Sequence, residues 1–116
     1  MGIWKRGGLS HSLGIETVGG KFTPLILKGT RLPAAVTETF TTAEPNQPSI
    51  KIKPFQGEMC LATLNKRLGL FEVTEIPPAG PGEPLIEISF HVDTGGAFSI
   101  TARDGHTGQD LPVLQR

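Results

Sequence analysis

The stretch Thr37–Gly57, TETFTTAEPNQPSIKIKPFQG, predicts a strand, a loop and a second strand. It begins with β-branched and aromatic residues, continues through a polar Pro/Asn/Gln segment, and ends in apolar residues that alternate with charged ones. Ile50 and Ile52 should share one face of the second strand, with Lys51 and Lys53 on the other, because successive side chains of a strand point to opposite faces. We therefore expect the loop to lie at the rim of a sheet, framing half the mouth of an apolar slot for an extended peptide.

The rest of the chain shows the same pattern of short strands and turns. Strand-like runs occur at residues 12–17, 22–27, 37–42, 49–56, 67–74, 85–93, 98–103 and 109–114. Pro24 indicates an edge position or a bulge, Pro112 weakens the last run, and residues 58–66 are too short for a reliable helix. The pattern predicts an all-β fold, a two-layer antiparallel β-sandwich of seven to eight short strands.

Composition narrows the function classes further. The 116 residues are enough for one domain, and the formal net charge of zero gives no electrostatic footprint for nucleic acid or an anionic membrane. Cys60 is the only cysteine, so an internal disulfide is excluded, and no apolar run approaches the roughly 20 residues that span a bilayer. We expect a cytoplasmic protein with a flexible tail over residues 1–11, an exposed Trp4, and a single domain over residues 12–116.

No catalytic constellation is visible in the sequence. His11, His91 and His106 fall on the predicted tail, the polar face of a strand and a turn, and none lies near a recognisable nucleophile motif. The glycine pairs are not followed by the G-K-[ST] of a phosphate-binding loop. We therefore expect that the chain is not an enzyme and that it binds no cofactor or metal.

Several motifs resemble a known family. They are SLGIETVGG at residues 12–20, TFTTAEPNQPSI at 39–50, QGE at 56–58, NKRLGLFEVTEIPPA at 65–79, and PLIEISFHVD with TARD and TG between residues 84 and 108. Together they resemble the β-sandwich substrate-binding domain of DnaK-type heat-shock chaperones, the seventy-kilodalton class, in a bacterial form. The resemblance covers residues 12–114, and it implies a cleft for extended segments of unfolded polypeptides rich in Leu, Ile or Val.

The resemblance also implies roles for ten residues. Ile15, Phe40, Ile50, Ile52 and Ile86 would line the central apolar pocket; Thr17, Thr41 and Gln47 would help to hold the peptide backbone; Val18 and Ala43 would close an arch over it. In such chaperones ATP acts through a nucleotide-binding domain, which the sequence does not contain, and a J-domain co-chaperone is a possible partner of a full-length relative.

The sequence departs from the family pattern at identifiable positions. WKRGGLSH stands in place of the apolar interdomain linker, the given sequence stops within the last predicted strand, before the position of the helical lid, and Pro45 and Pro81 stand where the family carries an acidic residue and an arginine that latch the lid. Two interpretations follow: a lidless peptide-binding module, or an inactive or structural β-sandwich remnant whose cleft is filled by its own Met1–Leu9 or C-terminal tail. The chain could be a monomer or could self-associate through the cleft.

Overall fold

The computed structural model describes residues 8–116, and the regular secondary structure of these residues is almost entirely β-strand. The strands are β1 (Leu13–Thr17), β2 (Lys21–Ile26), β3 (Ala34–Phe40), β4 (Ile50–Ile52), β5 (Pro54–Gln56), β6 (Lys66–Arg67), β7 (Phe71–Val73), β8 (Ile86–Val92), β9 (Phe98–Asp104), β10 (Asp110–Leu111) and β11 (Val113–Gln115). Within the described part of the chain the only helical element is the single 3₁₀ turn Ala62–Leu64. The predicted all-β fold is therefore confirmed.

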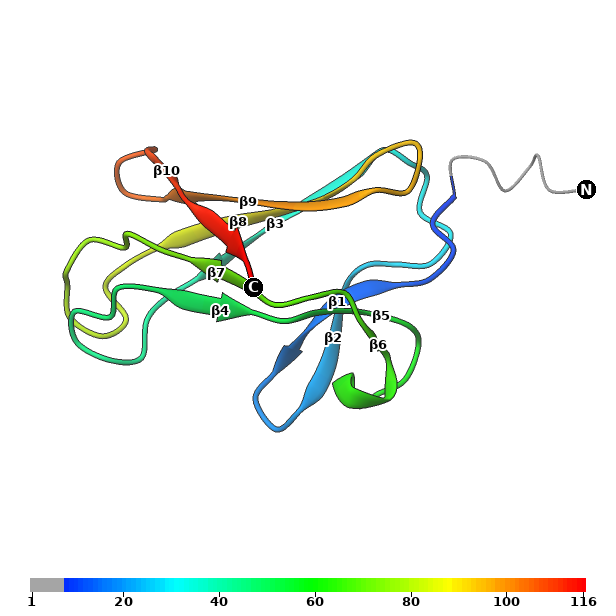
Figure 1. Ribbon diagram of the computed structural model, residues 1–116, viewed down its shortest axis with the longest axis horizontal. Coiled ribbons are helices and arrows are strands. Elements are labelled where there is room, and N and C mark those ends of the chain that lie inside the picture. Colours follow the sequence, from blue (N-terminus) through cyan, green and yellow to red (C-terminus); the bar gives the residue numbers. More distant parts are fainter. Residues whose placement is uncertain (1–7) are drawn as a thin grey trace, which may run out of the picture.

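The strands form two antiparallel layers. One layer is the sheet β10-β9-β8-β3, and the other combines the sheets β11-β7-β4 and β2-β1-β5-β6. Figure 1 shows β3, β8 and β9 above β4 and β7, with the β1–β2 hairpin below and to the side. The alternation in β8 buries Ile86, Ile88, Phe90 and Val92 between the layers. This alternation is the period-2 pattern that predicted the sandwich.

Three of the predicted strands are divided because they pass from one sheet to another. The run 49–56 becomes β4, which pairs with β7, and β5, which pairs with β1 and β6. The run 67–74 divides into β6 and β7, and the last run divides at Pro112 into β10 and β11. The described residues therefore contain eleven assigned strands rather than seven to eight, since each change of sheet interrupts a ladder.

The structure agrees with the prediction for Pro24 in β2, and it corrects the predicted length of the N-terminal tail. Strand β2 lies at the edge of its sheet, and its register with β1 shifts next to Pro24, so both features expected of that residue occur.

The predicted tail over residues 1–11 was too long: Leu9 is 9% exposed and packs with Leu13, Ile26 and Val92. Its amide donates to the Thr30 carbonyl at 2.9 Å, so the packed domain includes Leu9. Trp4 and the rest of residues 1–7 lie outside the described residues.

Candidate functional site: an apolar groove beside strand β4

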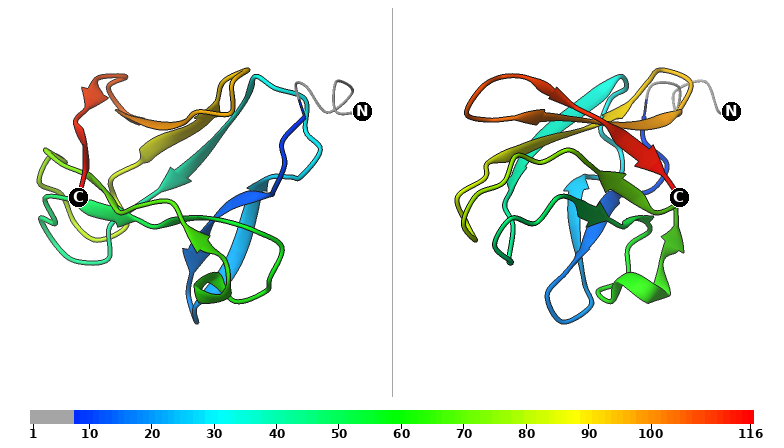
Figure 2. Two further views of the ribbon diagram at one scale, coloured as in Figure 1. Left: turned by 45° about the vertical axis from the view of Figure 1, so that its right-hand side comes forward. Right: turned by 60° about the vertical axis from the view of Figure 1, so that its left-hand side comes forward.

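A groove of about 440 Å³ opens where β1, the end of β3 and β4 approach one another. Its lining comes from three separate segments: Ile15, Glu16, Thr17 and Val18; Phe40, Thr41, Ala43 and Gln47; and Ile50, Lys51, Ile52 and Lys53. In Figures 1 and 2, β4 leads from the loop that follows β3 toward β1, so the groove runs along β4. Strand β4 is the last strand of its sheet, and the groove therefore lies at a sheet edge.

Nine of the ten residues assigned from the resemblance line this groove. The exception is Ile86, which is 1% exposed and lies opposite Phe40 in the β3–β8 ladder. It packs in the core cluster beneath the groove and does not line it. The alternation of β8 predicted which face Ile86 occupies, but it does not distinguish a core face from a groove wall.

The floor of the groove is apolar and tightly packed. Ile15, Ile50 and Ile52 are 6%, 8% and 4% exposed, and Phe40 packs against the same cluster. Each isoleucine therefore presents only a small part of its surface to the groove. Val18, by contrast, is 96% exposed on the turn after β1, and Ala43 is exposed in the loop after β3, so both lie at the rim.

Two polar side chains of the groove are already engaged within the chain. The Thr17 hydroxyl lies 2.9 Å from the Thr23 hydroxyl on the neighbouring strand. Gln47 accepts hydrogen bonds through Oε1 from the amides of Ala43 and Glu44, at 3.0 and 3.1 Å, and donates through Nε2 to the Ser49 carbonyl at 2.8 Å. The Gln47 side chain thus fixes the loop that carries it, a role that the sequence did not reveal.

A second loop supports the one that forms the groove wall. The amide of Asn46 donates to the Ala79 carbonyl at 2.8 Å, and the amide of Gly82 donates to the Thr42 carbonyl at 2.9 Å. Thr42 is 4% exposed, and its hydroxyl has no hydrogen-bond partner among the described residues. The proline-rich segment 76–84 therefore braces the wall from behind.

Charged residues that the sequence interpretation did not assign also line the groove. Glu16 from β1, together with Lys51 and Lys53 from the β4 segment, brings both signs of charge to its edge. The amide of Glu16 donates to the Lys53 carbonyl at 3.3 Å, which joins β1 to the end of β4. In the sequence these charged residues alternate with the assigned apolar residues. An edge strand can present both of its faces to a groove, so this alternation could have indicated that the charged residues line the groove as well.

Size alone does not single out this groove. Three other cavities have volumes of about 360, 470 and 350 Å³. The described residues contain no group of three or more His, Cys, Asp or Glu side chains arranged to hold a metal ion. Over residues 8–116 we find no helix that is long and apolar enough to cross a membrane.

Comparison with known proteins gives the family. The model of the Hsp70 protein family matches residues 9–113 of this chain. The chain belongs to the Hsp70 family. It is 48% identical over 98 residues to the chaperone protein DnaK of Psychrobacter cryohalolentis, an alignment that covers 84% of the chain and 15% of that protein. This Hsp70-family chain therefore spans about one seventh of the length of its relative.

The family match includes the whole groove. It begins at Leu9, the first residue of the described core, and it contains all ten residues assigned from the resemblance. Neither described end of the chain lines the groove: Leu9 packs in the second core cluster, and the amide of Arg116 donates to the Leu70 carbonyl at 2.7 Å. No observation on residues 8–116 therefore favours a cleft that is filled by the chain itself.

Proposed function

We propose that the groove beside β4 binds extended Leu-, Ile- or Val-rich segments of unfolded polypeptides, so that this part of an Hsp70-family protein is a chaperone substrate-binding module. One observation carries the proposal: residues 15–18 and residues 40–53, two stretches that are distant in the sequence, converge on a groove with an isoleucine floor and an exposed rim. Within this proposal the module has no catalytic role, and ATP and a J-domain co-chaperone would act through a nucleotide-binding domain.

The edge position of β4 supports binding through the peptide main chain. A terminal strand has backbone groups that are not used by its own sheet, and an extended peptide can pair with them. Burying one Leu side chain contributes roughly 1.5–3 kcal/mol, and each backbone hydrogen bond about 0.5–1.5 kcal/mol. Ordering the peptide offsets part of this, so we expect a dissociation constant on the order of micromolar.

Charge placed at the rim tests the proposal without disturbing the core. Val18→Asp should weaken binding of a fluorescent Leu-centred heptapeptide by about tenfold or more, because a carboxylate would be partly desolvated against an apolar ligand. The fold should persist, since Val18 is 96% exposed. Fluorescence anisotropy measures the dissociation constant, and circular dichroism checks the fold.

The matched control is Leu64→Asp. Leu64 is 59% exposed and does not line the groove, so this variant should bind the peptide as the wild type does. Equal affinity of the Val18→Asp and Leu64→Asp variants would refute the assignment of the groove. Ile52→Asp should abolish binding, but Ile52 is 4% exposed in the core, so this variant is informative only if it folds.

A further inference from the structure

A carboxylate outside the groove is connected to the groove wall by hydrogen bonds. Glu72 is the central residue of β7, and its side chain is 16% exposed. Its Oε1 accepts hydrogen bonds from Arg116 Nε at 2.9 Å and Nη2 at 2.5 Å. Its Oε2 accepts from the Ser49 hydroxyl at 2.8 Å. Both carboxylate oxygens are therefore used, one on each side of β7.

Ser49 passes this restraint to the rim. The residue immediately precedes β4, and its carbonyl accepts the hydrogen bond from Gln47 Nε2. Gln47 Oε1 in turn accepts from the amides of Ala43 and Glu44. An unbroken series of hydrogen bonds thus leads from Arg116 through Glu72, Ser49 and Gln47 to Ala43, and both Gln47 and Ala43 line the groove.

The charges around Glu72 favour its ionised form. Arg116 and Ser49 hydrogen-bond to the carboxylate, and Lys51 lies opposite Glu72 in the β4–β7 ladder. The Arg116 and Ser49 hydrogen bonds, and the positive charges of Arg116 and Lys51, hold the pKa of Glu72 below its usual value. The carboxylate is therefore a persistent acceptor for Ser49 near neutral pH.

We propose that Glu72 is a positioning residue for the groove: it holds Ser49 and Gln47, and thereby the Ala43 side of the rim, in the conformation that retains a bound peptide. This inference rests on the proposed function of the groove. We expect Glu72 to affect the rate of peptide release, because loosening the rim should raise the dissociation rate more than it changes the association rate.

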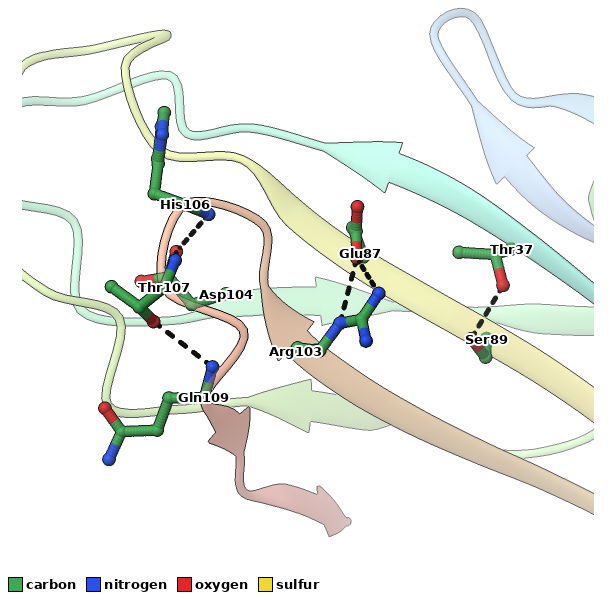
Figure 3. Close-up of polar contacts among 8 residues, drawn as sticks. All are labelled: Thr37, Glu87, Ser89, Arg103, Asp104, His106, Thr107 and Gln109. Atoms are coloured by element: carbon green, nitrogen blue, oxygen red, sulfur yellow. Dashed lines mark hydrogen bonds and ion pairs between the residues drawn. The ribbon is translucent and has the colours of Figure 1, made fainter.

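The other layer contains a matched ion pair. Glu87 Oε1 accepts from Arg103 Nε at 3.0 Å and Nη2 at 2.6 Å, the same arrangement as in the Glu72–Arg116 pair. Figure 3 shows this pair on the outer face of the sheet, close to the Thr37–Ser89 contact and to the turn that contains His106. Neither Glu87 nor Arg103 lines the groove, so the pair controls for the loss of a surface ion pair.

The experiment compares Glu72→Ala, Glu72→Gln and Glu87→Ala in the full chain. We measure the release rate of the fluorescent heptapeptide by competition, and the hydrogen exchange of the Ala43 and Glu44 amides without peptide.

Glu72→Ala should raise the release rate about 3- to 10-fold and should speed exchange at both amides. Glu72→Gln should show smaller increases in both the release rate and the exchange rates than Glu72→Ala, because its side-chain amide oxygen can still accept the hydrogen bond from Ser49. Glu87→Ala should change neither, and urea unfolding of all three variants corrects for global stability.

The outcomes separate this inference from the proposed function. If the wild type binds the peptide and Glu72→Ala behaves like Glu87→Ala in both measurements, the inference is wrong and the peptide site stands. Absence of peptide binding by the wild type would refute the proposed function. The positioning of the rim would still be decided in that case, since unchanged exchange at Ala43 and Glu44 would overturn it and faster exchange would support it.

Discussion

Glu58, like Glu72, holds a serine that is distant in the sequence. Its carboxylate accepts hydrogen bonds from the Ser12 hydroxyl at 2.7 Å and the Ser12 amide at 3.1 Å. The Ser12 hydroxyl also accepts from the Lys28 amide at 2.9 Å. Ser12 is 5% exposed and directly precedes β1, so one carboxylate fixes the start of the strand that ends at the groove.

The hydrogen bonds from Ser12 hold the pKa of Glu58 below its usual value. A carboxyl whose pKa is lower in the folded state stabilises the fold fully above the unfolded-state pKa, and this contribution disappears as the pH falls through the folded-state pKa. Stability should therefore decline from about pH 5 downward. In Glu58→Gln, urea unfolding between pH 7 and pH 3 should show a smaller decline than in the wild type. An equally steep decline in both would contradict this assignment.

The hydrogen-bond partners of individual side chains could not be predicted from the sequence. The resemblance gave Thr17 and Gln47 to the peptide backbone, yet their side chains contact Thr23 and the loop around Gln47 itself. Composition could not show this, because Gln and Thr side chains bond to any nearby donor or acceptor. The Glu72–Ser49 contact joins residues 23 positions apart and depends on the β4–β7 pairing, so no local pattern predicts it.

At the scale of elements, the hairpin of β1 and β2 depends on one close backbone approach. A Cβ atom at Gly14 would collide with the Thr23 carbonyl and would lie 2.8 Å from Pro24 Cα. Gly14→Ala should therefore destabilise the fold by about 1–3 kcal/mol or more, measured by urea unfolding. Gly95→Ala is the control, because its Cβ would meet only the Asp93 carboxylate at 3.4 Å. Similar stabilities of the two variants would show that the hairpin opens at little cost.

The positions of the strands were predictable, but the sheet to which each one belongs was not. In the predicted run 49–56 buried and exposed residues alternate through β4, but Pro54 and Phe55 of β5 are both buried. Pro112, which has no amide hydrogen to donate, indicated the interruption of the last run, and Pro54 offers the same signal at the start of β5. The division between β6 and β7 has a weaker signal in the sequence, the glycine at position 69, whose φ in the structure is 139°.

At the scale of the whole molecule, the sandwich has two core clusters with different neighbours. The larger one includes Ile15, Ile50, Ile52 and Ile86, and it supports the groove. The smaller one surrounds Leu9 and Leu13 at the other end of β1. Strand β1 contributes to both, so the groove is built on the core that stabilises the fold.

The most direct test is a map of amide chemical shifts during titration with the Leu-centred heptapeptide. Our account predicts saturable shifts concentrated in residues 15–18, 40–47 and 50–53, with small shifts around the cavity formed by Leu13, Leu68 and Phe98. The Val18→Asp variant should lose the first set of shifts. Shifts centred on that second cavity, or no shifts at peptide concentrations far above micromolar, would contradict the central claim that the groove beside β4 receives extended apolar peptides.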